Sequence, residues 1–313
     1  MTAITEQDKA PHDPFEVEHG VRVVPLRTPT LPPATHTNCV VLGEENVILV
    51  DPASPYPEEQ ARLEAWVAAH HVRVQAIWLT HHHMDHVAGA SAAKATFDAP
   101  ICAHPATAKR LENVVGIDVE LFEGDTPQGV HGAELGIEVA ALHTPGHARG
   151  HLAFRVGGTH TIVAGDLVAG QGTIVIDPPE GDMADYLATL GRLVTEGVGA
   201  VVPSHGPAIV SGEDKLLEYI AHRQMREEQL LTALGEREGR PLDLVPVIYP
   251  DVPTIFHPLA SRQVLAHLLK LEGEGRVERP DGSTGVPGAP VYMSADMAGW
   301  NAMLPVFRLC QSA

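Results

Sequence analysis

Residues 80–89 are the part of the sequence with the clearest capacity for chemistry. They are Thr-His-His-His-Met-Asp-His-Val-Ala-Gly, and they follow an apolar run that predicts a β-strand. Imidazole nitrogens and carboxylates are ligands that suit a borderline metal such as zinc. We therefore expect His81 and His83 to point at one ion, and Asp85 and His86 to turn toward a second. A solvated, histidine-rich surface loop is the alternative, and the Asp85–His86 pair so soon after an apolar strand disfavours it.

Three further apolar segments end in a residue that can bind a metal. The first runs through a Pro-Gly turn to His147, the second ends at Asp166, and the third is followed by His205. A carboxylate at the end of a buried strand is costly unless a cation or hydrogen-bond donors meet it. Either histidine taken alone is equally well explained by a structural role. Together with the histidine-rich segment, these residues supply enough ligands for two metal ions.

Other histidines near these segments are expected to have different roles. His82 alternates with two proposed ligands and should face away from the metals. His143 and His151 flank the segment that carries His147, and we expect them to pack or to form hydrogen bonds to the ligands rather than to coordinate. Structural or solvent-facing positions are expected for His104 and for the pair at residues 70–71.

The order of the predicted elements indicates an α/β fold built in layers. Residues 39–42 and 47–50 predict a β-hairpin with both strands largely buried, and Pro57 predicts the start of a helix that ends near residue 70. The first 35 residues, rich in proline and acidic side chains, are expected to be only partly ordered. Strands mixed with helices continue to about residue 210, which is typical of a layered domain. The further expected strands span residues 72–79, 100–103, 137–142, 152–156, 160–164 and 198–203, and the further helices 88–97, 105–112 and 182–195.

The composition changes after Gly212. Three helices, over residues 213–234, 242–249 and 259–271, precede a β-hairpin of residues 276–279 and 291–293. This order is typical of a small winged-helix-like domain. The expected organisation is therefore a flexible N-terminus (1–19), a metal-binding domain (20–212), a winged-helix-like domain (213–295) and a C-terminal tail (296–313).

The overall charge disfavours some classes of partner. The 313 residues include 21 basic and 40 acidic side chains, a net charge of −19, and residues 213–313 hold only 10 of the basic and 14 of the acidic ones. Such an acidic chain is poorly suited to hold nucleic acid or an anionic membrane surface. No apolar run reaches the roughly 18 residues of a membrane span, the first residues lack a signal-peptide pattern, and the three cysteines do not suggest a disulfide framework. We therefore expect a cytoplasmic protein.

The ordered set of ligand-type residues resembles the dinuclear metal signature of the metallo-β-lactamase superfamily, close to its hydroxyacylglutathione-hydrolase-like branch. The resemblance covers roughly residues 20–210 and implies an αββα sandwich with two zinc ions at one edge, or iron or manganese in their place. It also implies that Asp51 orients the metal loop by hydrogen bonds instead of coordinating. The first metal would be held by His81, His83 and His147, the second by Asp85, His86 and His205, and Asp166 would bridge the two.

The C-terminal region resembles the winged-helix domain of the β-lactamase-like protein 2 group. The similarity rests on residues 221–227 and 258–277, and on Gly165-Asp166-Leu167 followed by residues 170–173. A short helical tail with some basic residues is the alternative. The group includes single-strand endoribonucleases and, in polyketide pathways, acyl-carrier-protein thioesterases. Residues 258–282 carry four basic and four acidic side chains, so we expect this domain to shape the substrate cleft rather than to bind nucleic acid.

These features predict a metal-dependent hydrolase. Two cations that share Asp166 would also share a water, and hydroxide would then be available at neutral pH to attack an ester-like acyl bond. Asp85 is the expected acceptor of the proton of that water. We expect a small acyl substrate, a thioester or a lactone, and no membrane partner, and the oligomeric state is left open. A metal-dependent single-strand endoribonuclease is the alternative, and the intact ligand set disfavours a non-catalytic protein with a degenerate site.

Overall fold

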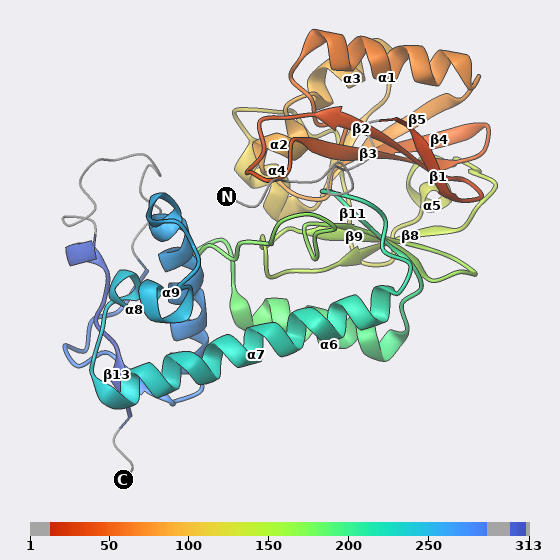
Figure 1. Cartoon of the computed structure of the whole chain (residues 1–313). Helices are drawn as coiled ribbons and strands as arrows, with labels where there is room; N and C mark the ends of the chain where they lie inside the picture. The colour runs from red at the N-terminus through yellow and green to blue at the C-terminus, as the bar shows by residue number, and fades with distance from the viewer. Residues whose placement is uncertain (1–12, 287–300, 311–313) are drawn as a thin grey trace. The chain divides into compact units, whose positions relative to one another are not determined.

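The computed structural model describes residues 13–286 and 301–310 (Figure 1). Over these residues the chain divides into two compact units. The first contains the described residues up to Thr144, together with Gly150–Ile174 and Leu193–Leu216. The second contains Pro145–Arg149, Val175–Arg192 and the described residues from Leu217 onward. Two short segments within residues 20–212 are therefore grouped with the C-terminal part of the chain, and the domain boundary at residue 212 stays a prediction.

The first unit contains a seven-stranded mixed sheet in which the strands follow one another in sequence order. Its first four strands are antiparallel, and the last three run parallel to the fourth. The parallel strands end at a common edge, which is where such sheets place their sites. The strands are β1 (Phe15–Glu18), β2 (Val21–Arg27), β3 (His36–Gly43), β4 (Asn46–Val50), β5 (Arg73–Trp78), β6 (Ile101–Ala103) and β7 (Val119–Glu120).

A second sheet of four strands completes the β-structure of the first unit. Its order is β11-β10-β9-β8, with an antiparallel meander that ends in one parallel pair. Each of these strands lies close to the residues predicted for it. They are β8 (Val139–His143), β9 (Leu152–Val156), β10 (Thr161–Gly165) and β11 (Val201–Pro203).

The helices also begin and end near the predicted residues, with two short additions. Pro57 lies at the first turn of α1 and acidic side chains follow it, a sequence that suits a helix N-terminus. The helices α2 and α5 were not predicted, because each is a single turn with little sequence signal. The set is α1 (Pro57–Ala69), α2 (Met84–Val87), α3 (Ala90–Phe97), α4 (Pro105–Leu111), α5 (Pro127–His131), α6 (Met183–Glu196), α7 (Gly212–Glu236), α8 (Pro241–Ile248) and α9 (His257–Gly273), with a 3-10 turn at Thr254–Phe256.

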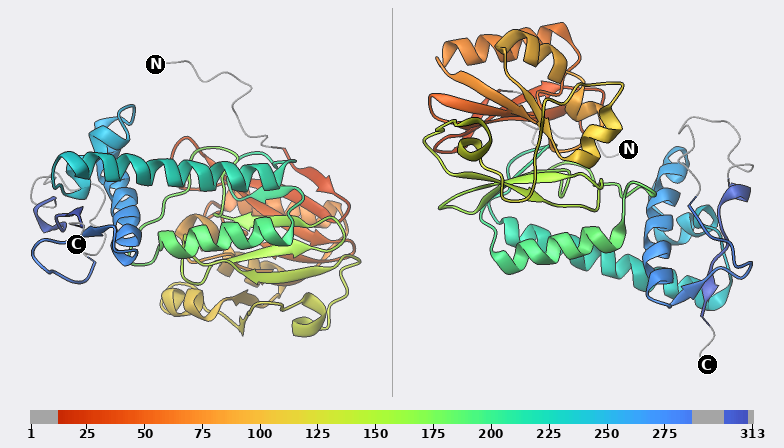
Figure 2. Two further views of the ribbon diagram at one scale, coloured as in Figure 1. Left: turned by 90° about the horizontal axis from the view of Figure 1, so that it is seen from below. Right: turned by 180° about the vertical axis from the view of Figure 1, so that it is seen from behind.

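Alternate residues of the central strands enter two separate apolar cores. Along β3, Val40 and Leu42 pack between the two sheets, whereas Cys39 and Val41 pack beneath α1 and α3. Figures 1 and 2 show α1 and α3 on the outer face of the seven-stranded sheet. Because both faces are covered, residues 39–42 of β3 and 47–50 of β4 are apolar and buried, as the sequence predicted. Cys39 is fully buried in this way and packs as an apolar side chain.

The N-terminal prediction requires a correction. Residues 15–18 and 21–27 form β1 and β2, although the sequence suggested a flexible segment to residue 19 and partial order to about residue 35. Val21 and Val23 are fully buried in the core between the sheets. β2 pairs with β3 over seven residues, and this pairing orders the segment. The sequence did not reveal the strands because proline and acidic residues surround them.

The second unit has its own apolar core, and the end of the chain contributes to it. Leu230, Leu268 and Phe307 are fully buried in this core. The strand β12 (Val277–Glu278) pairs with β13 (Arg308–Leu309), whereas the predicted hairpin partner at residues 291–293 lies outside the described residues. The prediction of a separate tail from residue 296 is therefore wrong for residues 304–309, since apolar side chains there complete the C-terminal core. No helix in the described ranges is both long and apolar enough to cross a membrane.

We predict that Phe307→Ala lowers the free energy of unfolding of the second unit by about 3–5 kcal/mol, because it removes a fully buried aromatic ring. Urea unfolding followed by far-ultraviolet circular dichroism measures this loss. Met303→Ala is the matched control, since Met303 is 65% exposed on the same segment and its loss should cost at most about 0.5 kcal/mol. Equal stability of the two variants would show that the end of the chain is dispensable.

Candidate metal centre

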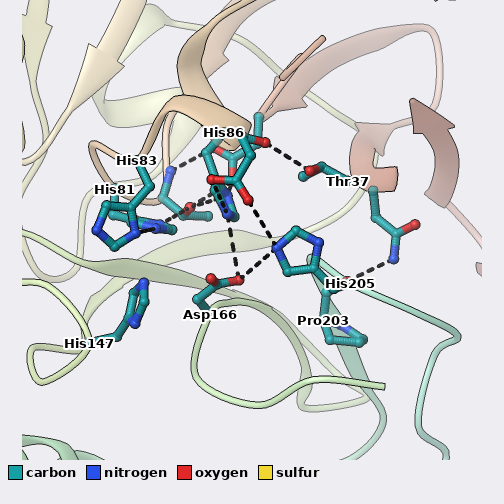
Figure 3. Close-up of polar contacts among 12 residues, drawn as sticks. Thr37, His81, His83, His86, His147, Asp166, Pro203 and His205 are labelled. Atoms are coloured by element: carbon teal, nitrogen blue, oxygen red, sulfur yellow. Dashed lines mark hydrogen bonds and ion pairs between the residues drawn. The ribbon is translucent and has the colours of Figure 1, made fainter. Parts of the chain in front are cut away.

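Two groups of ligand-type residues lie at the edge where β5, β10 and β11 end (Figure 3). Within each group, one nitrogen or oxygen atom per residue lies within 4.8 Å of those of all other members. The seven residues predicted as ligands are therefore brought together, in two clusters. One group is His81, His83, His147 and Asp166, and the other is Asp85, His86 and His205.

A buried carboxylate at the end of β4 fixes the histidine-rich segment. Asp51 is 1% exposed and accepts hydrogen bonds from the backbone N–H of Thr80 at 2.8 Å and from its hydroxyl at 2.6 Å. Its Oδ2 also lies 2.8 Å from Nδ1 of His86. Asp51 thus holds the start of the segment and one proposed ligand at once. Its contacts agree with the expectation that it orients the metal loop and does not coordinate.

Three of the histidines present their Nε2 atoms because an acceptor faces Nδ1. The acceptor is Asp51 for His86, the backbone carbonyl of Val175 for His147 at 2.8 Å, and the backbone carbonyl of His36 for His205 at 3.0 Å. An acceptor at Nδ1 keeps the proton there and leaves the lone pair on Nε2. This arrangement is the one in which a neutral imidazole binds a metal.

The spacing of the ligand atoms fits a metal ion. Nε2 of His86 and Nε2 of His205 each lie 3.6 Å from Oδ1 of Asp166, and Nε2 of His205 lies 3.6 Å from Oδ2 of Asp85. Two ligand atoms bonded to one zinc ion at tetrahedral angles lie roughly 3.4 Å apart. Buried Nε2 of His86 has no hydrogen-bond partner within the described part of the chain. These distances are too long for hydrogen bonds and suit atoms that share a cation.

Asp166 lies at a position from which it reaches both groups. It belongs to the group of His81, and its Oδ1 is also near the Nε2 atoms of His86 and His205 in the other group. Figure 3 shows its carboxylate below His86 and beside His205. The geometry is compatible with the predicted bridging role, which remains a prediction.

The electrostatics of the second group favour a positive charge. Burial alone would lower the pKa of His86, but the carboxylates of Asp166 and Asp85 outweigh burial and hold that pKa well above its ordinary value. A metal ion at Nε2 supplies the same positive charge in place of a proton. The charges around His86 therefore suit a bound metal cation.

The strand β3 supports two of the ligand loops, a role that sequence reasoning missed. The hydroxyl of Thr37 donates to the backbone carbonyl of Asp85 at 2.8 Å. The side-chain amide of Asn38 donates to the carbonyls of Pro203 and Gly206, both at 2.8 Å, on either side of the last ligand. Both supporting side chains are buried. In the sequence, the feature that could have pointed to this role is the pair of adjacent polar residues, Thr37 and Asn38, just before the apolar part of the strand.

His151 supports the backbone of Asp166. Its Nε2 accepts a hydrogen bond from the backbone N–H of Asp166 at 3.0 Å, and its Nδ1 lies 2.8 Å from the hydroxyl of Thr144. A Cβ atom on Gly165 would lie 2.5 Å from that same Nε2, so only glycine fits between them. The expectation that His151 forms hydrogen bonds near the ligands is confirmed.

His104 and His143 have the structural roles expected of them. His143 stacks on His104 with ring centroids 4.3 Å apart, and Nδ1 of His104 accepts from the N–H of Ala106 at the start of α4. Burial, together with the charge of His143, lowers the pKa of His104 to about 4. His82 is not among the residues whose ligand atoms converge.

This fold and cluster define a class of metal-dependent hydrolases, and comparison with known proteins identifies the family. A model of the metallo-β-lactamase superfamily matches residues 32–205, which is more than half of the chain. The chain therefore belongs to this superfamily. A model of the β-lactamase-associated winged-helix domain matches residues 241–285. These matches confirm the predicted α/β metallo-β-lactamase fold with its smaller C-terminal winged-helix domain.

Similar proteins cover most of the chain. A β-lactamase-like protein 2 homolog of Caenorhabditis elegans is 28% identical over 264 residues, which are 78% of this chain and 81% of that protein. The atrochrysone carboxyl ACP thioesterase of Aspergillus chevalieri is 29% identical over 252 residues, 78% of this chain and 77% of that protein. A crystal structure of a metallo-β-lactamase family protein from Thermus thermophilus has a TM-score of 0.69 at 24% identity and covers 93% of this chain and 99% of its own. The last similarity shows that the fold is shared.

We predict that Asp166→Ala removes both metal ions, because one carboxylate lies within reach of both ligand groups. Elemental analysis after reconstitution should find about two ions per chain for the unaltered protein and close to none for the variant. His82→Ala is the control on the same loop and should keep both ions. Equal losses of metal from the two variants would mean that His82 points toward the metal ions, contrary to its predicted orientation.

We also predict that Asp51→Ala weakens metal binding by about 10–100-fold, because residues that orient ligands typically contribute this much. Titration against a chromophoric chelator measures the affinity. Asp118→Ala serves as control, since Asp118 binds Lys94 and the backbone N–H of Ile101 elsewhere on the same sheet. An unchanged affinity in the Asp51 variant would contradict the role of this carboxylate.

Proposed function

We propose that this metal-dependent hydrolase holds two zinc ions and cleaves an ester-like acyl bond, with an acyl thioester as its preferred substrate. The observation that carries the proposal is the pair of ligand groups that meet at Asp166. When bound, two such ions lower the pKa of water and polarise the bond under attack. The remaining groups of the chain then orient the ligands and move one proton.

Asp85 is the residue that we assign to the proton. Its Oδ1 lies 3.9 Å from Nε2 of His86, and its Oδ2 lies 3.6 Å from Nε2 of His205. Its side chain is 20% exposed, whereas that of His86 is fully buried. Asp85 therefore combines contact with the ligands and access to solvent, which suits a carboxylate that accepts a proton and passes it on.

The choice of a thioester is supported by relatives and by charge. A relative with similar length and 29% identity is named as a thioesterase that acts on an acyl carrier protein. Residues 1–212 carry 11 basic and 26 acidic side chains, so few phosphates of an RNA strand would find a cationic partner. A small acyl substrate is less affected by this excess of negative charge. We also propose a cytoplasmic location, which agrees with three free cysteines, of which Cys39 and Cys102 are buried.

The proposal is tested by assaying the zinc-loaded protein with an acyl pantetheine thioester, a lactone and a single-stranded RNA at two salt concentrations. We expect the thioester to have the highest kcat/KM. His83→Ala should reduce its turnover by about 100-fold or more, because metal polarisation contributes several kcal/mol to the barrier. His82→Ala should retain most of the activity.

The RNA arm separates the proposal from its main competitor. Any RNA cleavage should be slow and equal in the unaltered protein and in the His83 variant. Efficient, metal-dependent RNA cleavage with little thioester turnover would reject an acyl substrate in favour of a ribonuclease.

A further inference from the structure

The segment 175–178 of the second unit contacts a proposed metal ligand. The backbone carbonyl of Val175 accepts the hydrogen bond from Nδ1 of His147 at 2.8 Å. A shift of this carbonyl would rotate the imidazole and move its Nε2. The position of segment 175–178 therefore controls where one ligand atom points.

The same segment is held by two adjacent residues of α9 in the winged-helix domain. The side-chain oxygen of Gln263 accepts from the backbone N–H of Ile176 at 2.8 Å. The guanidinium of Arg262 donates to Oδ1 of Asp177 at 2.6 Å and to the backbone carbonyl of Pro178. Three consecutive residues of the segment are thus bonded to one turn of a helix more than eighty residues away in the sequence.

Burial makes these contacts specific. Arg262 is 0% exposed and Gln263 is 6% exposed. Burying a guanidinium is costly unless its donors are met, and an apolar residue would pack a helix at lower cost. A fork of donors directed at a carboxylate and at a carbonyl fixes the backbone in a way that apolar packing cannot.

The turn that carries His147 is bound to the same part of the chain. The backbone N–H of Asp182 donates to the carbonyl of Gly146 at 2.7 Å, and Arg149 donates to the carbonyl of Pro179 at 2.9 Å. Gly146 has φ of +138°, and a Cβ atom there would lie 2.3 Å from Cα of Tyr186. The turn therefore rests directly on the segment that follows residue 178, within the second unit.

We propose that Arg262 and Gln263 are positioning residues for His147, so that helix α9 of the winged-helix domain sets the geometry of one metal ligand. The inference rests on the proposed function, in which His147 binds metal. Metal sites require ligand distances within about 0.2 Å of their ideal values. The hydrogen bonds at Ile176 and Asp177 fix the residues next to the Val175 carbonyl, on which the orientation of the His147 ring depends. Helix α9 then positions one candidate ligand within the second unit, in addition to packing in its own domain.

The experiment measures metal affinity and the absorption spectrum of the cobalt-substituted protein, not activity. Gln263→Leu removes the acceptor of Ile176 and keeps a similar volume. We expect it to lower the affinity for one of the two ions by about 10–100-fold and to shift the cobalt absorption bands. Gln263→Glu retains an oxygen at this place and should recover most of the affinity.

A variant of the same helix serves as control. Lys270 pairs with Glu227 and Glu274 in the same unit, so Lys270→Met should change stability without changing the affinity or the spectrum. Arg262→Lys keeps the charge but loses the forked guanidinium donors, and it should also weaken the binding of one ion. If Gln263→Leu does not fold, this variant tests the inference in its place.

Two results would overturn the inference. One is unchanged affinity and an unchanged spectrum in folded Gln263→Leu and Arg262→Lys, and the other is an equal loss of affinity in Lys270→Met. If the unaltered protein binds two ions and Gln263→Leu and Arg262→Lys bind them equally well, only the positioning role fails. If the unaltered protein binds no metal, the proposed function fails with it.

Discussion

The buried carboxylate of Asp51 is the interaction on which the metal centre depends. It accepts hydrogen bonds from the end of β5 and from a proposed ligand on α2, and it sits itself at the end of β4 with φ of 48°. Aspartate tolerates this left-handed conformation better than most residues. A single side chain thus joins two parallel strands to the ligand loop, and it does so where water cannot compete for its oxygens.

Around this anchor, the ligands are held by a layer of neutral hydrogen bonds. Backbone carbonyls meet the Nδ1 atoms of His147 and His205, while Thr37 and Asn38 fix the backbone of the loops beside them. These contacts leave the Nε2 atoms of the histidines directed at the carboxylate oxygens of Asp85 and Asp166. The imidazole nitrogens of His86 and His205 lie 3.6 Å from neighbouring carboxylate oxygens, which is too far for hydrogen bonds and suits atoms that share a cation.

The division of the chain into units also changes how its domains are understood. The turn at residues 145–149 belongs with the winged-helix part of the chain, although it lies between strands of the metal-binding domain in sequence. Arg262 and Gln263 explain this association, since they bind the segment on which the turn rests. In the proposed arrangement, helix α9 acts as a scaffold for one of the candidate ligands.

The sequence by itself indicated the candidate ligands and most elements, because the segments before His81, Asp166 and His205 are largely apolar and a buried carboxylate or imidazole at the end of such a strand is costly without a partner. By type and order alone it singled out His81, His147 and Asp166, whose ligand-type atoms the fold brings together. It did not determine that residues 15–27 join the sheet or that residues 304–309 complete the C-terminal core, since pairing partners lie far away in sequence. Nor did it indicate the roles of Thr37, Asn38 and Gln263. Only the tertiary structure decides these, because a hydrogen bond to a distant backbone group leaves no periodic pattern in the chain.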